Sequence, residues 1–199
     1  MIETMACRGT SDDPQSWERY DNIFRDAFAS LEDAGCEIAA IASVTPHARL
    51  AEAVEGTTLP VVSILDVTVQ ALKDHSLESA VVLGTSLTMS GQWFHNSLRE
   101  ADIACPDVIS QRDIDEISRM LEDYFYPGKG IEGRADLLAF CHRLTSGFEK
   151  TAIILACTDF SNAFPEYSAE TVFELEGMVF VDSGTAHIQE LLRLAMMPV

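Results

Sequence analysis

Two hydrophobic patterns alternate along this chain. Short apolar runs, typical of buried strands, are separated by longer stretches in which apolar residues recur every three or four positions, as in amphipathic helices. The runs that predict strands are residues 1–6, 38–43, 60–65, 80–83, 107–110, 151–156 and 178–182. The stretches that predict helices are residues 14–35, 45–56, 66–75, 88–101, 112–126, 132–147 and the segment after 182. Strands that alternate with helices favour parallel sheets, so the pattern predicts an α/β fold.

Proline and glycine mark several boundaries of these elements. Asp13 followed by Pro14 predicts a helix N-cap with proline in the first turn, and Gly35 predicts the end of that helix. The clearest loop is the Pro-Gly-Lys-Gly segment at 127–130. Its Lys129 could close over an anion or simply be a solvated loop lysine.

Two strand ends carry a thiol or a hydroxyl at equivalent points of two similar half-sequences. One apolar run ends at Cys157 and another at Ser43; in each half a second run follows and closes on an aspartate, Asp182 or Asp66. Parallel strands present such groups at the carboxyl edge of a sheet, where α/β folds hold ligands. Two facing edges would bracket one small molecule. That arrangement suits removal of a proton from one face of a carbon and return of a proton to the other.

Cys157 has two interpretations. Its thiol precedes a predicted helix start, where backbone amides would favour the thiolate and lower its pKa. A cysteine after an apolar run is also commonly a packed core residue, but the polar Thr158 and Asp159 beside it favour a functional role. The cysteines without a comparable setting, interpreted as packing residues, are Cys7, Cys36, Cys105 and Cys141.

Ser43 and the histidines are weaker candidates. A serine at a strand end is usually an N-cap, and its hydroxyl is a far poorer base than a thiolate. His47, four residues after Ser43, is a core, capping or catalytic residue. His187 either orients or activates the thiol or caps the last helix.

A further strand-to-helix turn is rich in hydroxyls. Thr85, Ser86 and Thr88 follow Gly84 at the end of a predicted strand. Hydroxyls together with backbone amides can bind a carboxylate. Such turns are also common structural caps.

The charge of the chain excludes some partners. A formal net charge of −19 makes nucleic acid and anionic membranes unfavourable partners. An anionic substrate would have to be held by helix N-termini, amides and hydroxyls. No apolar run approaches the roughly 20 residues of a membrane helix, and the N-terminus lacks the pattern of a secretory signal. Five cysteines without a Cys-x-x-Cys pair or metal-like spacing argue for free thiols in the cytoplasm and for no metal.

Five segments together resemble the aspartate/glutamate racemase superfamily, most closely its aspartate racemase and broad-specificity amino-acid racemase branch. They are residues 42–47 (ASVTPH), 59–66 (LPVVSILD), 83–89 (LGTSLTM), 154–159 (ILACTD) and 181–187 (VDSGTAH). Each motif alone has low specificity. They occur in the family's order and at family-like separations from about residue 38 to the C-terminus, so the ordered set is fairly specific.

The resemblance implies two similar α/β domains related by pseudo-twofold symmetry, with the active site in the cleft between them. One domain would comprise residues 1–75 and 183–199, and the other residues 76–182. The family works without a cofactor, and two cysteines on opposite sides of the substrate Cα act as base and acid. Cys157 matches the second cysteine, whereas Ser43 stands in place of the first and Val44 in place of the asparagine that usually follows it.

The family's glycine-rich N-terminal loop has no counterpart in this sequence. We therefore expect the first domain to lack its usual opening strand, loop and helix, unless the start of the chain is misassigned. A homodimer would cover the apolar surface that this leaves.

The predicted function is that of a cofactor-independent isomerase acting on an acidic or similar small amino acid, with Cys157 as the principal acid/base and Ser43 opposite it. The residues predicted to bind the substrate are Thr45, Thr85, Thr88, Thr158 and His187. Two alternatives stay open. One is a single-thiol decarboxylase or isomerase of a dicarboxylic acid. The other is a catalytically inactive member that binds a small acid or a protein partner.

Overall fold

The structure is a computed structural model that describes residues 14–148 and 150–197. The predicted strand at 1–6, the Asp13 cap and Cys7 lie outside these residues. The backbone separates into two compact units, Met1–Ile41 with Arg49–Val62 and Ala42–Ala48 with Ser63–Val199. The domain boundaries near residues 76 and 183 stay a prediction.

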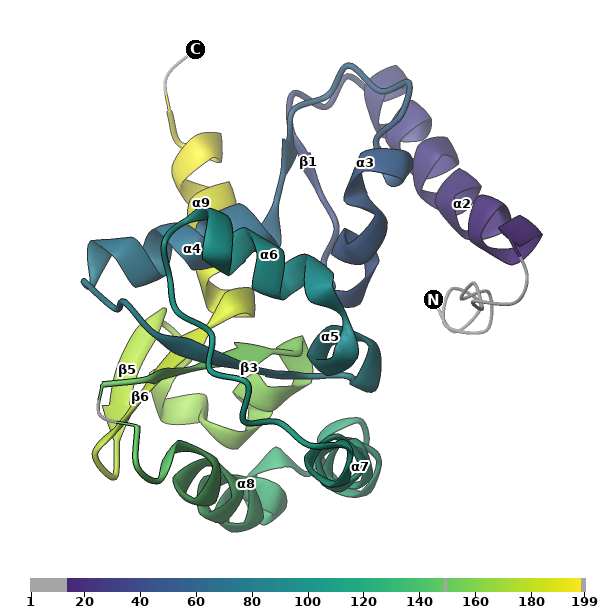
Figure 1. Cartoon of the computed structure of the whole chain (residues 1–199). Coiled ribbons are helices and arrows are strands. Elements are labelled where there is room, and N and C mark those ends of the chain that lie inside the picture. The colour runs from purple at the N-terminus through teal and green to yellow at the C-terminus, as the bar shows by residue number, and fades with distance from the viewer. Residues whose placement is uncertain (1–13, 149, 198–199) are drawn as a thin grey trace. The chain divides into compact units, whose positions relative to one another are not determined.

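The described residues of the first unit form the helices α2 and α3 and a small parallel sheet (Figure 1). Helix α2 spans Pro14–Asp33, α3 spans Leu50–Ala53, and β1 (Ala39–Ala40) pairs with β2 (Val61–Val62). Phe28, Ile41 and Ala53 are among its buried core residues. The strands predicted at 38–43 and 60–65 are therefore correctly placed, but the hydrogen-bonded pairs are only two residues long.

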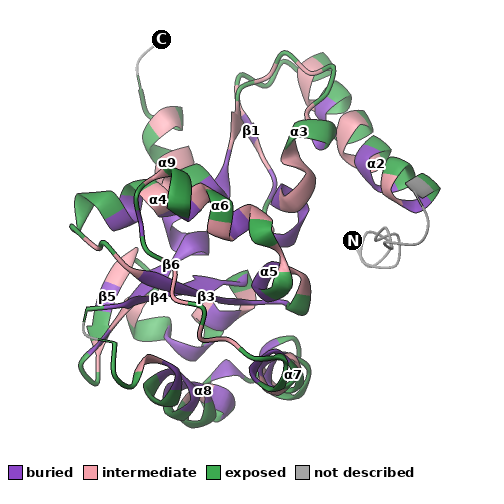
Figure 2. Cartoon of the chain, in the orientation of Figure 1, coloured by how far each residue is buried: buried purple, intermediate pink, exposed green. Residues whose placement is uncertain are grey.

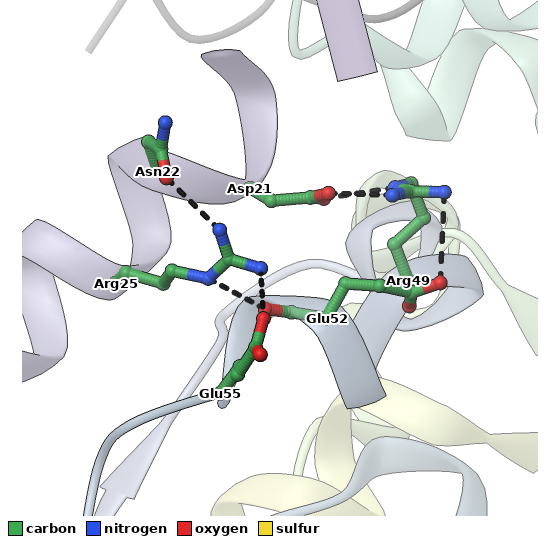
Figure 3. A network of polar contacts seen from close by, with 6 residues as sticks. All are labelled: Asp21, Asn22, Arg25, Arg49, Glu52 and Glu55. Atoms are coloured by element: carbon green, nitrogen blue, oxygen red, sulfur yellow. Dashed lines mark hydrogen bonds and ion pairs between the residues drawn. The ribbon is translucent and has the colours of Figure 1, made fainter. Parts of the chain in front are cut away.

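A polar network joins α2 to the segment around α3 (Figure 3). Asp21 is 2% exposed, and its two carboxylate oxygens accept bonds of 2.8 and 2.5 Å from the guanidinium of Arg49. The same guanidinium lies over the ring of Trp17, 5.1 Å from its centroid. Arg25 of α2 pairs with Glu55 at 2.7 Å. Because a buried carboxylate needs a partner, the two-pronged Arg49 contact fixes the helix at this point.

The second unit is built on a four-stranded sheet of order β3-β4-β6-β5. Its strands are β3 (Ala80–Gly84), β4 (Ala152–Ala156), β5 (Val172–Leu175) and β6 (Met178–Asp182). Its helices are α4 (Ile64–Asp74), α5 (Ser86–Ser90), α6 (Gln92–Glu100), α7 (Gln111–Met120), α8 (Gly130–Thr145) and α9 (Ser183–Ala195). Shorter turns are the 3-10 helices η1 (Thr45–Arg49), η3 (Thr158–Ala163) and η4 (Pro165–Tyr167) and the π-turn η2 (Leu121–Phe125).

Helices cover both faces of this sheet (Figure 1). Val82 and Ile154 pack with residues of α4 and α6, whereas Leu83 and Leu155 pack with residues of α7 and α8. The strands β3 and β4 are buried along their whole length, as the apolar runs predict for strands covered on both faces (Figure 2). The predicted α/β class is confirmed. Among the described residues, no helix is both long and apolar enough to cross a membrane.

One predicted strand is absent, and another ends earlier than predicted. Residues 107–110 form no strand, because Ser110 begins a capping box with Asp113 and so starts α7. The predicted strand 60–65 stops early, because the Ser63 hydroxyl accepts a bond from the amide of Asp66 and caps α4 from Ile64 onward.

The antiparallel edge strand β5 was missed. It joins β6 through Glu176 and Gly177, which both have positive φ, 52° and 76°. Two consecutive positive φ values fit a tight hairpin turn whose usual sequence signal is Asn-Gly or Asp-Gly. Glu-Gly lacks the short side chain that favours this conformation, so the turn was not recognisable.

Candidate active site

Three of the predicted segments meet at one edge of the second unit's sheet. β3 and β4 are parallel and in register with Gly84 opposite Ala156, so Thr85 and Cys157 leave the sheet side by side. On the other side of β4, Leu155 is opposite Asp182 of β6. The carboxyl ends of the strands thus gather the predicted side chains at one place, as in other open α/β sheets.

The approach of these two strand ends requires glycine at position 84. A Cβ atom there would lie 2.6 Å from the carbonyl oxygen of Ala156 and 3.0 Å from the Thr88 methyl group. Both distances are shorter than ordinary contacts. The absence of a side chain at Gly84 therefore lets Thr88 and the β4 backbone close on each other.

Three threonine hydroxyls form a continuous buried chain at this edge. The Oγ1 atom of Thr85 lies 3.1 Å from that of Thr45 and 3.0 Å from that of Thr88. All three residues are buried, and Thr85 also accepts from the Thr88 amide as the cap of α5. Two bonds among three hydroxyls use two of the three hydroxyl hydrogens. The third hydroxyl hydrogen is not used within this chain.

Cys157 begins the turn that follows β4. Its carbonyl oxygen accepts from the amide of Phe160 at 3.0 Å, which closes the first turn of η3. Its Sγ lies 3.7 Å from a carboxylate oxygen of Asp159, within range of a thiol hydrogen bond. Cys157 is 8% exposed, so the thiol packs against the core yet keeps some accessible surface.

The other described cysteines differ from Cys157. Burial raises the pKa of the Cys105 thiol to about 11, and burial also raises the pKa of Cys141. Cys36 is exposed and lies in the first unit. The interpretation as a packing residue therefore holds for Cys141 and in part for the half-buried Cys105, but it was wrong for the exposed Cys36.

His47 holds the Ser43 segment in place. Its Nδ1 donates to the carbonyl oxygen of Ser43 at 2.9 Å, and its Nε2 accepts from the amide of Ile64 at 3.1 Å. An amide can only donate, so Nε2 must be the unprotonated nitrogen of a neutral ring. Burial lowers the pKa of His47 to about 4, and the nearby His187 adds to this effect. Of the three interpretations, this geometry supports a capping residue that joins Ser43 to the start of α4.

This environment predicts acid sensitivity that depends on His47. The folded-state pKa is depressed, so the unfolded chain binds more protons as the pH falls below about 6.5. We expect roughly 3 kcal/mol of stability to be lost between pH 6.5 and 4 through this residue, at about 1.4 kcal/mol per pH unit. His47→Gln, whose amide can donate and accept, should flatten the curve in this window. Urea unfolding at a series of pH values measures it, and parallel curves for the two proteins would contradict the assignment.

The remaining predicted residues lie around the same edge. Thr158 is exposed, and its methyl group would be 3.2 Å from a Cβ at position 184, so it packs against Gly184. His187 of α9 is buried, and its ring centroid is 6.0 Å from that of His47. Ser43 is half-buried at the start of the segment that leads to Thr45. Strand register and a hydrogen bond thus link Thr45, Thr85 and Cys157, whereas Ser43 is bonded to His47. That Ser43 faces Cys157 stays a prediction.

The sequence match decides the family. A family model described as Asp/Glu/Hydantoin racemase matches residues 3–191. This chain belongs to that family. No curated protein matches the chain.

Solved structures of racemase-family proteins share its fold. An aspartate racemase homologue from Pyrococcus horikoshii is 22% identical with a TM-score of 0.77, over 94% of this chain and 78% of its own. The aspartate racemase of Picrophilus torridus is 20% identical with a TM-score of 0.63, over 88% and 69%. A double mutant of arylmalonate decarboxylase in the liganded form is 15% identical with a TM-score of 0.63, over 94% and 78%. At these identities the likeness shows the fold alone.

One strand-end aspartate of this racemase-family chain lies apart from the edge. Asp66 is exposed in the first turn of α4, on a groove of about 610 Å³ that Gln70 of α4 and Arg193 of α9 also line. None of the predicted site residues lines this groove. Its counterpart Asp182 does lie at the edge, where it accepts a hydrogen bond from Ser161. The sequence analysis placed Asp66 and Asp182 near strand ends, but no sequence pattern predicts the hydrogen bond between Ser161 and Asp182.

Proposed function

We propose that this protein is a cofactor-independent isomerase that moves a proton at the Cα of an acidic or similarly small amino acid. The observation that carries the proposal is the register of β3 and β4, which sets Cys157 beside Thr85. A thiol and a hydroxyl chain then lie at one sheet edge. We assign Cys157 as the acid/base and the threonines as the carboxylate-binding residues.

The hydroxyls suit a carboxylate in a strongly anionic protein. The chain of Thr45, Thr85 and Thr88 has one hydrogen to donate, and the exposed Thr158 beside Cys157 adds a second hydroxyl. Fixed donors of this kind stabilise negative charge as it develops in the transition state. In the proposed reaction, the Cys157 thiolate takes the α-proton, and the electron pair left on Cα is delocalised into the bound carboxylate. The thiol then returns a proton.

Ser43 makes the proposed reaction one-sided. A serine hydroxyl is a much weaker acid and base than a thiol, and the neighbouring His47 is neutral with both of its ring nitrogens already bonded. We therefore infer efficient proton exchange for one enantiomer and slow formation of the other. His187, whose ring centroid lies 6.0 Å from that of His47, would belong to the Ser43 side of the site.

A single-thiol decarboxylase is the second candidate. The observation that favours it is the presence of one cysteine and one serine at the paired positions, together with the fold shared with arylmalonate decarboxylase. In that reaction a dicarboxylic acid would lose carbon dioxide, and the Cys157 thiol would protonate the resulting carbanion. In this reaction too, the Cys157 thiol would be the proton donor and the chain of hydroxyls would bind a carboxylate.

Proton exchange and carbon dioxide release separate these candidates. Purified protein is incubated in D₂O with each enantiomer of aspartate and glutamate, and with substituted malonates. We expect deuterium at Cα of one enantiomer of an acidic amino acid, detected by mass spectrometry and chiral chromatography. Carbon dioxide release from a malonate would instead favour the decarboxylase. Neither reaction in a folded sample would count against catalysis and would leave a small-acid-binding protein as the conclusion.

A further inference from the structure

A buried carboxylate ties the turn that begins at Cys157 to the neighbouring strand end. Asp182, the last residue of β6, is 4% exposed. One of its carboxylate oxygens accepts from the hydroxyl of Ser161 in η3 at 2.6 Å. The other accepts from the backbone amide of Thr185 at 2.9 Å and so caps α9. One side chain therefore connects η3 with α9.

The position of η3 determines the position of the thiol. Cys157 is the residue that precedes η3, and the turn between Cys157 and Ser161 is short and closed by the bond from the Phe160 amide. Thr158 at the start of the same turn packs against Gly184 in the first turn of α9. On its other side Cys157 follows Ala156, which β3 fixes through its register with Gly84. The Ser161 contact is thus the polar link that holds this turn toward β6.

We propose that Asp182 and Ser161 are positioning residues for the proposed acid/base Cys157. The pair holds η3 so that the thiol and the amides at the start of η3 keep a fixed geometry. It also neutralises part of the Asp182 charge by a short, charge-assisted hydrogen bond. The carboxylate in contact with the thiol itself is that of Asp159, 3.7 Å from Sγ and in the same turn. This inference rests on the proposed function of Cys157, but it concerns the geometry of the turn and can be measured without a substrate.

Ser161→Ala is the sharpest test, because it removes the bond to η3 and leaves the cap of α9 in place. The pH dependence of Cys157 alkylation by iodoacetamide, followed by mass spectrometry, reports the environment of the thiol. We expect its midpoint to rise by about half a pH unit or more, since a looser turn no longer holds the amides at the start of η3 in the geometry that favours the thiolate. In the exchange assay we expect kcat to fall roughly ten- to a hundredfold, with KM within about threefold, because misplacement affects the chemical step.

Two further variants separate positioning from a general loss of structure. Ser118→Ala removes a half-buried serine hydroxyl that donates to the carbonyl oxygen of Ile114 in α7, and it should leave the alkylation profile unchanged. Asp182→Ala should resemble Ser161→Ala or exceed it. Asp182→Asn should restore most of kcat relative to Asp182→Ala, because its amide oxygen can accept from Thr185 and its amide NH₂ can donate to Ser161.

The outcomes distinguish this inference from the proposed function. Unchanged Cys157 alkylation in folded Ser161→Ala and Asp182→Ala would overturn the positioning role, whatever the catalytic result. A shifted profile without any substrate turnover by the wild type would support positioning while the proposed function fails. Ser118→Ala could also lower the thermal midpoint of unfolding. If it then shifted Cys157 alkylation as much as Ser161→Ala does, the effect would be one of stability alone, and the proposal would be overturned.

Discussion

Cys157→Ala should lower the rate of α-proton exchange by on the order of 10²–10⁴-fold, the usual cost of losing an acid or base. The thiol is the strongest acid/base group that we place at the sheet edge, and Thr85 in register beside it is held by two other hydroxyls. Alanine removes the proton acceptor while leaving the hydroxyl chain intact. Substrate binding should therefore persist while kcat falls.

The measurement is deuterium uptake at Cα together with binding of the same amino acid by calorimetry. Cys36→Ala is the matched control, because it removes an exposed thiol in the other unit. Its exchange rate should equal that of the wild type. Full exchange by Cys157→Ala would exclude this residue as the base, and loss of binding together with loss of exchange would point to a damaged pocket.

Ser43→Cys should raise the rate of interconversion between enantiomers by a similar factor of about 10²–10⁴. The carbonyl oxygen of residue 43 is fixed by the His47 ring, which also caps α4, so a thiol at this position would have a well-held backbone. A second thiol would supply the acid/base group that serine provides poorly. Both enantiomers should then exchange their α-proton at comparable rates.

Chiral chromatography of the amino acid over time measures this gain. Ser118→Cys supplies an extra thiol on α7 and should leave interconversion unchanged. An unchanged rate in a folded Ser43→Cys protein, with one-sided exchange retained, would show that residue 43 does not face the substrate carbon. The Cys157 assignment would survive that result, but the paired arrangement would not.

The sequence predicted the buried strands better than the contacts between the strand ends. The apolar runs before Gly84 and Cys157 were long enough to identify as strands covered on both faces, but the register of the two strands comes from the structure. The link between Thr45 and Thr85 joins residues forty positions apart. No local pattern encodes such a contact, so the resemblance alone suggested that these threonines act together.

Three further features could not be predicted from the sequence, because contacts between distant residues decide them. His47 was open to three interpretations, and only its two hydrogen bonds identify it as a cap. Val108 and Ile109 are apolar and looked like part of a strand, yet they pack against the core from a segment without strand pairing. Prediction of β5 required recognition of the Glu176–Gly177 turn, whose backbone conformation is uncommon for glutamate.

The chain of three hydroxyls has a consequence for which end can donate. Its hydrogen bonds can run from Thr45 toward Thr88 or from Thr88 toward Thr45, because the Thr85 oxygen accepts one hydrogen and donates its own in either case. Reversal leaves every heavy atom in place, yet it moves the hydrogen that the chain does not use from Thr88 to Thr45. Thr88 is 0% exposed, whereas Thr45 is 5% exposed. A ligand that accepts a hydrogen bond from Thr45 would therefore set the direction of all the bonds in the row.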